Sequence, residues 1–199
     1  VCVGYGWCLA EKGAAITLPF EKMNAFEKWK STDGYGYFHG LLRKRRFIKG
    51  QAVPEHLDSE ALLGFDQGLG RSLWYHSKGD LEKLALDLQN FEAKRLPGVL
   101  RGVGLAAFYV GGMDDALMKD LNSLSSNNQA SFLFGAFVAI LGRKYANTLE
   151  TETNREFEQI SAISTQQLFD KVEYPDTKAE KISSWIATIE SDFKKSTAS

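Results

Sequence analysis

A Gly-x-Gly step recurs along the chain at nearly constant intervals, each time at the head of an apolar segment. The first glycines of successive steps are 30, 34, 34 and 33 residues apart. The steps are Gly4 with Gly6, Gly34 with Gly36, Gly68 with Gly70, Gly102 with Gly104, and a degenerate copy at Gly135 and Ala136. A period in this range is typical of stacked helical hairpins. The sequence therefore predicts an all-α protein, built as a helical-repeat array with a period of about 30–34 residues.

Glycine costs a helix about 1 kcal/mol relative to alanine, so a repeated pair needs a compensating reason. We expect that reason to be close approach of neighbouring helix backbones, because a missing side chain lets a residue of the next helix pack against the main chain. Aromatic residues beside the glycines, such as Tyr35, Trp74 and Tyr109, would fill the space around such crossings.

Residues 1–150 are expected to hold the array, and residues 151–199 the helices that cap it. Segments 99–110 and 132–141 are apolar almost all round, which favours central helices covered on several sides. Val1 is not a methionine and the chain opens inside a repeat unit, so we expect an N-terminal part to precede it.

The C-terminal helix has the clearest local signal. Thr177 and Glu180 are spaced as a capping box. The predicted apolar face that follows consists of Ile182, Trp185, Ile186, Ile189 and Phe193. One apolar face and one charged face are what a terminal capping helix requires.

Composition narrows the class of protein. The net charge of −1 argues against general electrostatic binding to nucleic acid. The longest apolar run, 132–141, is shorter than the roughly 20 residues that span a bilayer, and no signal peptide is evident. We therefore predict a cytoplasmic protein, in which Cys2 and Cys8 point to different helix faces and stay free thiols.

Polar residues in an otherwise apolar segment give the best candidate site. The glycines of residues 64–71 lack the spacing and the preceding strand of a dinucleotide-binding loop. Asp66, Gln67 and Arg71 need polar partners if they are buried. They predict either a buried hydrogen-bonding network that fixes helix register or an anchor at the end of an apolar pocket, with Arg71 holding a carboxylate or polarising a carbonyl.

The three histidines, His39, His56 and His76, lie in different segments without metal-ligand spacing. We therefore expect no metal and no cofactor. His39, near Asp33 and two tyrosines, is the best candidate for acid–base chemistry. Such a histidine is more often a packing residue.

The strongest charge cluster, which we call the basic segment, consists of Arg43, Lys44, Arg45, Arg46 and Lys49. A run of this kind usually marks a solvated helix end. The alternative is a docking surface for an acidic partner, such as a carrier protein, or for a phosphate group. Glu55, Asp58 and Glu60 follow closely and could neutralise it within the chain.

Four sequence blocks resemble an uncharacterised bacterial family associated with enediyne biosynthesis, over roughly residues 1 to 145. The blocks are residues 3–7, 33–36, 68–75 and 102–112. The resemblance implies a role beside an enediyne polyketide synthase and a longer N-terminus, although related sequences also occur outside enediyne producers. His39 is displaced by one position relative to the family's histidine, so this chain lacks any chemistry that depends on that register.

Two functional hypotheses follow. In the first, the protein is a non-catalytic accessory that binds a polyketide synthase, a carrier protein or an apolar, polyene-like small molecule. Its ligand-binding residues would be Gln67, Trp74 and Tyr109, and its partner-binding residues the basic segment. In the second, it is a metal-independent, cyclase-like enzyme that uses Arg71, Asp66 and His39 around an apolar cavity, which requires the three side chains to converge.

Overall fold

The computed structural model describes residues 1–13, 22–171 and 181–197. Within these ranges all regular structure is helical, which confirms the all-α prediction. The predicted capping box of Thr177 and Glu180 lies outside the described residues. The helices are α1 (Cys2–Glu11), α2 (Ala25–Leu42), η2 (Arg45–Lys49), α3 (Ser59–Ser77), α4 (Leu81–Leu88), α5 (Leu96–Val110), α6 (Asp115–Leu124), η3 (Ser126–Asn128), α7 (Gln129–Tyr145), α8 (Thr151–Ser161), α9 (Thr165–Lys171) and α10 (Ile182–Ser196).

Local sequence signals fix where these helices begin and end. Asn24 and Glu27 form a reciprocal capping box at the start of α2, with both hydrogen bonds at 2.9–3.0 Å. Asp80 and Asp114 cap α4 and α6 through the backbone N–H three residues on. Gly79 and Gly111 take positive φ angles just after α3 and α5, where a left-handed residue ends a helix.

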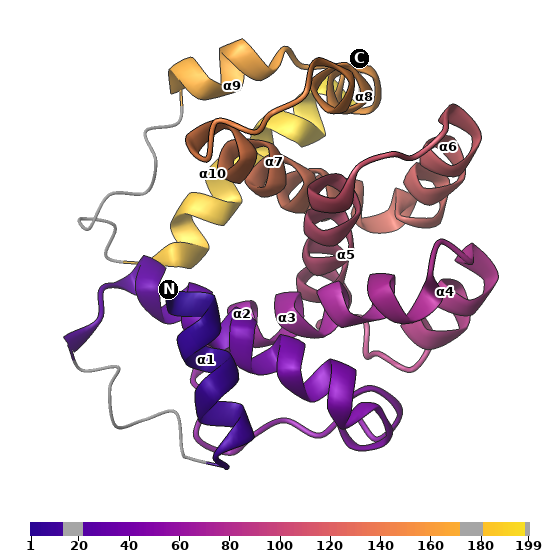
Figure 1. The fold of residues 1–199 in the computed structure, drawn as a ribbon. Helices are drawn as coiled ribbons and strands as arrows, with labels where there is room; N and C mark the ends of the chain where they lie inside the picture. Colours follow the sequence, from indigo (N-terminus) through magenta and orange to yellow (C-terminus); the bar gives the residue numbers. More distant parts are fainter. Residues whose placement is uncertain (14–21, 172–180, 198–199) are drawn as a thin grey trace.

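Five helices, α1, α2, α3, α5 and α7, pack in chain order, and we call them the inner helices. Each contacts the next extensively, so α2 lies between α1 and α3, and α5 between α3 and α7. The short helices α4 and α6 lie outside this row (Figure 1). The two segments predicted to be central, in α5 and α7, are largely buried, except that Tyr109 and Val110 at the end of α5 are exposed.

Glycines bring consecutive inner helices into backbone contact. Gly34 of α2 lies against Val3 of α1, while Gly36, two residues on, lies against Phe65 of α3. A β-carbon at either glycine would overlap a backbone carbonyl oxygen of the neighbouring helix. The same overlap is found for Gly6 with Ser31, Gly68 with Asp33, Gly70 with Val99, Gly102 with Gln67, Gly104 with Phe132 and Gly135 with Arg101.

Three of the Gly-x-Gly steps therefore contact two neighbouring helices each. In α2, α3 and α5 the first glycine faces the preceding inner helix and the second faces the following one. Gly4, the first glycine of α1, has no heavy atom of the described residues within 4 Å of its β-carbon position. In α7 the residue two positions after Gly135 is Phe137, a buried ring, so glycine contacts end there.

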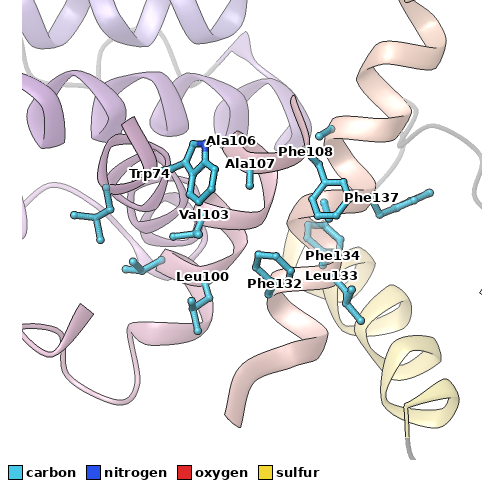
Figure 2. Packing of buried hydrophobic residues seen from close by; sticks show 14 of the residues in the cluster. Trp74, Leu100, Val103, Ala106, Ala107, Phe108, Phe132, Leu133, Phe134 and Phe137 are labelled. Carbon is cyan, nitrogen blue, oxygen red and sulfur yellow. The ribbon is translucent and has the colours of Figure 1, made fainter. Parts of the chain in front are cut away.

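Aromatic side chains fill the space between the inner helices and the C-terminal helices. Figure 2 shows Trp74 of α3, Val103 of α5 and Phe132, Phe134 and Phe137 of α7 in one buried cluster. Phe157 of α8 is fully buried there.

Helix α10 returns to the start of the chain. Its Trp185 lies 5.0 Å from Phe134 of α7 and 6.0 Å from Trp29 of α2, measured between ring centres. The predicted apolar face of α10 is confirmed, since Ile182, Ile186, Ile189 and Phe193 are buried.

Candidate functional site

All five inner helices contribute to the lining of one open pocket of about 370 Å³. Val3 of α1 and Gly142 of α7 lie among the lining residues, on the first and last inner helices. Apolar and aromatic side chains, including Trp29, Leu105 and Tyr109, form most of the remaining wall. A volume above about 300 Å³ is in the range of small-molecule sites.

A compact polar cluster lies in this wall. Asp33 of α2 accepts a hydrogen bond from Gln67 Nε2 of α3 at 2.6 Å. It also forms an ion pair with Arg71 of α3. The contact fixes the orientation of the Gln67 amide, because a carboxylate oxygen can only accept and must face the NH₂ group. Helices α2 and α3 run in the same direction, since Gly64 lies near Trp29 and Gly40 near Ser72, and this brings residue 33 opposite residues 67 and 71.

Arg71 is held in a fixed position and stays charged. Its guanidinium lies 4.5 Å from the ring centre of Tyr37, in a cation–π contact. Burial disfavours the charge of Arg71, but the ion pair with Asp33 outweighs this effect and raises the pKa of the guanidinium. The side chain of Asp33 is only 3% exposed, whereas that of Arg71 is 18% exposed. The guanidinium of Arg71 therefore faces the pocket, and the buried carboxylate of Asp33 holds it in position.

Comparison with protein-family models places the chain in a family. A model described as a protein of unknown function, DUF1702, matches residues 1–191. The chain belongs to the DUF1702 family. No curated protein and no solved structure shows significant similarity to it.

Two of the three predicted ligand-binding residues line the pocket of this DUF1702 protein. Gln67 and Tyr109 are both in the wall, and Tyr109 is 57% exposed. Trp74 is not among the lining residues; it is 7% exposed and packs in the core (Figure 2).

Asp66 points away from the pocket although it precedes Gln67. It forms a buried ion pair with Arg95, whose Nε lies 3.1 Å from Oδ1. Burial raises the pKa of Asp66, an effect that the hydrogen bond and charge of Arg95 oppose. Arg95 also donates to the backbone oxygen of Gln51, which ties the segment before α3 to α5. Of the two arrangements predicted for Asp66, a buried network that fixes helix register or an anchor in a pocket, the contacts with Arg95 correspond to the first.

His39 lies in a different aromatic cluster. Its ring stacks on Phe47 of η2 at 4.2 Å and meets Tyr35 edge-on at 4.4 Å, measured between ring centres. Both ring nitrogens are buried without a hydrogen-bond partner among the described residues. Desolvation, with added repulsion from Arg43, Arg46 and His56, lowers the pKa of His39 to about 4. Arg71, Asp66 and His39 therefore lie in three separate environments, and only Arg71 lines the pocket.

The basic segment lies at the end of α2 and in η2. Arg43, Arg45, Arg46 and Lys49 are exposed, and Lys44 forms an ion pair with Asp87 of α4. Within the described ranges, none of the five forms an ion pair with Glu55, Asp58 or Glu60. The four exposed cations remain available to solvent.

Neither a metal site nor a membrane span is found among the described residues. In the part of the chain that the structure describes, no three His, Cys, Asp or Glu side chains gather as a metal site requires. Every helix in the same ranges is too short or too polar to cross a bilayer. Cys2 and Cys8 are free, as predicted.

Sequence reasoning missed Asp33 as a site residue, together with Lys30, Tyr75 and Gly142 in the wall. A signal for Asp33 exists in the sequence. The residue immediately before the glycine step is polar in three inner helices, namely Asp33, Gln67 and Arg101, and each is at least 96% buried. A buried polar residue at the same place in successive helices predicts contact between neighbours, and Asp33 and Gln67 are indeed bonded.

Proposed function

We propose that this DUF1702 protein is an accessory protein that binds a small, predominantly apolar molecule in the pocket between its inner helices. The observation that carries the proposal is the convergence of five helices on one pocket, whose described wall is mostly apolar and aromatic and contains the polar cluster of Asp33, Gln67 and Arg71. Such a combination of apolar surface with a few fixed polar groups is typical of small-molecule sites.

The glycine contacts support a preformed pocket. Neighbouring inner helices touch through their backbones, so their spacing cannot adjust by rotamer changes of intervening side chains. A rigid wall reduces the entropy lost on ligand binding. It also makes the pocket selective for shape.

The recurrence of the glycine step supports a further proposal about architecture. We infer that the inner helices, with the short helices η2, α4 and α6 between them, form a helical-repeat array of about 30–34 residues per unit over residues 1–150, capped by residues 151–199. The resemblance to enediyne-associated proteins leads us to propose a polyene-like intermediate as the ligand, in the cytoplasm and beside a polyketide synthase.

A pocket-filling variant tests the function. Gly142 lies on α7 in the pocket wall, and no heavy atom of the described residues lies within 4 Å of its β-carbon position, so the backbone there accepts the larger side chain of Gly142→Leu. The probe is cis-parinaric acid, a conjugated tetraene whose fluorescence rises in apolar surroundings. We expect wild-type protein to bind it and Gly142→Leu to weaken binding by about tenfold or more.

The matched control is Gly4→Leu. Gly4 is also a helical glycine with open space around it, but it is not part of the pocket wall. This variant should bind the probe as the wild type does. Equal binding by wild type and Gly142→Leu, with both folded by circular dichroism, would contradict the proposal.

The alternative is a cyclase-like enzyme that depends on Arg71 without Asp66 and His39, since those two side chains lie outside the pocket. One observation favours it: Arg71 presents a fixed positive charge to a mostly apolar pocket. Such a charge could stabilise a developing oxyanion. Replacement of Arg71 by methionine distinguishes the two when it is combined with Asp33→Asn, so that no buried carboxylate is left without its cation. Loss of product in a reconstituted synthase reaction, with folding and partner binding intact, would support the enzyme.

Partner binding through the basic segment stays a prediction of the accessory model. Four exposed cations beside each other suit an acidic protein surface. Charge reversal at Arg45 and Lys49 should abolish co-purification with a carrier protein and leave the binding of cis-parinaric acid unchanged, because neither residue lines the pocket.

A further inference from the structure

We infer that the pocket recognises its ligand by a carboxylate, which lies against Arg71 while an apolar chain occupies the remaining wall. This inference rests on the proposed function and names the chemical class of the ligand. It follows from the charges in the wall, from the hydrogen-bonding capacity left in the polar cluster, and from the way in which Arg71 is supported.

The charged pair in the wall presents its cation to the pocket. Asp33 is the single acidic side chain among the described lining residues, and it forms an ion pair with Arg71. The Asp33 side chain is 3% exposed and that of Arg71 is 18% exposed, so an entering ligand meets the guanidinium rather than the carboxylate. A ligand carboxylate would be attracted to this guanidinium, whereas an ammonium group would be repelled by it.

The hydrogen-bonding capacity of Arg71 points the same way. Each carboxylate oxygen of Asp33 already has a donor, Arg71 on Oδ1 and Gln67 on Oδ2. Arg71 uses only Nη1 in that contact, and a guanidinium has five N–H donors in a planar fork. The unused donors of Arg71 suit a two-oxygen acceptor such as a carboxylate.

Arg71 is supported before any ligand arrives. Asp33 and the face of Tyr37 fix the guanidinium in position, and α2 and α3 are joined there by the glycine contacts of Gly36 and Gly68. An arginine held in this way loses little side-chain entropy when it binds an anion. Apolar contacts for the rest of the ligand are available from Leu105, Ala106 and Val138.

The experiment compares two probes that differ only at the polar end. These are cis-parinaric acid and its methyl ester, titrated into the full chain with fluorescence as the readout. We expect the acid to bind about tenfold or more tightly than the ester, as a charge-assisted hydrogen bond requires. Raising the salt concentration should narrow this difference.

Variants of the cluster assign the preference to Arg71. Because Arg71→Gln alone would leave Asp33 buried without its cation, the informative variant is Asp33→Asn with Arg71→Gln, which removes both charges and keeps similar shapes. It should bind the acid and the ester equally. Asp33→Asn alone leaves Arg71 uncompensated and should increase the preference for the acid.

Three results would overturn the inference. Equal binding of both probes by the wild type, or tighter binding of the ester, would refute carboxylate recognition and leave the apolar pocket standing. A preference for the acid that persists in the double variant would place recognition away from Arg71. Absence of binding by either probe would refute both the inference and the proposed function.

Discussion

The inner helices and the C-terminal helices are held together by different means. Between α1 and α7, neighbouring helices touch through glycines, and a single added methyl group would overlap a backbone oxygen. Beyond α7, contacts are made by rings: Phe157 of α8 lies 6.0 Å from Phe108 of α5 and 6.1 Å from Phe193 of α10, between ring centres. The spacing of the inner helices is set by backbone contacts, whereas that of the C-terminal helices is set by the volume of packed side chains.

The difference determines how each region responds to substitution. A backbone contact has no rotamer with which to relieve a clash, so the helices must separate and lose the packing along their whole length. A ring cluster can repack around a smaller residue, and the cost depends on the cavity that remains. We therefore expect an all-or-none response in the first region and a graded response in the second.

The largest effect is expected for Gly36→Ala. Its β-carbon would overlap the carbonyl oxygen of Phe65, so α2 and α3 must move apart. We expect the free energy of unfolding to fall by about 4 kcal/mol, or the protein not to fold, because overpacking displaces backbone rather than a side chain. Urea unfolding followed by circular dichroism measures the change.

Gly4→Ala is the matched control, since the same substitution is made on an inner helix where the β-carbon meets open space. It should be neutral or stabilise by up to about 1 kcal/mol, as alanine favours the helix. Similar losses in both variants would mean that glycine acts through the helix itself and not through contact between helices.

A smaller effect is expected from acid at His39, where ring packing occurs within the glycine-joined region. The pKa of His39 is about 4 in the folded protein and about 6.5 when unfolded. Below pH 6.5 the unfolded chain takes up a proton that the folded protein refuses, so stability falls between about pH 6.5 and pH 4, by at most about 3 kcal/mol.

The difference in stability between wild type and His39→Leu isolates this contribution, because carboxylates titrate equally in both. The variant should lose less stability over the same pH interval. If the free energy of unfolding of the two proteins changes with pH in parallel, the folded protein accepts a proton at His39. The ring nitrogens of His39 would then not be shielded from water as their burial indicates.

The smallest effect is expected for Phe157→Leu in the C-terminal ring cluster. Phe157 is fully buried among Phe108, Phe137 and Phe193. Leucine keeps much of the volume, so the free energy of unfolding should fall by about 1 to 2 kcal/mol without loss of folding. A collapse as severe as that of Gly36→Ala would remove the distinction between the two regions.

Sequence predicted the fold in those features that depend on one helix at a time. The apolar face of α10 and the burial of α5 and α7 both follow from local patterns. Close approach at the glycines was expected as well. The sequence did not predict that the two glycines of one step face two different helices. A spacing of two residues shows that the glycines point in different directions from the helix axis, but not which helix lies on each side.

The site was predicted less completely. Gln67 and Arg71 stood out as polar residues in an apolar segment, but the residue that unites them, Asp33, lies 34 positions earlier on another helix. Asp66 and His39 satisfied the same criterion of a polar residue in apolar surroundings. Their partners, Arg95 and Phe47, come from other elements, so the criterion could not separate them from pocket residues.

The return of α10 has a consequence for how the molecule opens. Helices that contact only their neighbours in a row can melt from one end, one unit at a time. Here α10 touches Trp29 of α2, pairs Glu190 with Arg101 of α5, and lies against Phe134 of α7. Unfolding of α2, α5 or α7 therefore breaks contacts with α10, which all three helices share. This shared helix makes unfolding of the inner helices cooperative.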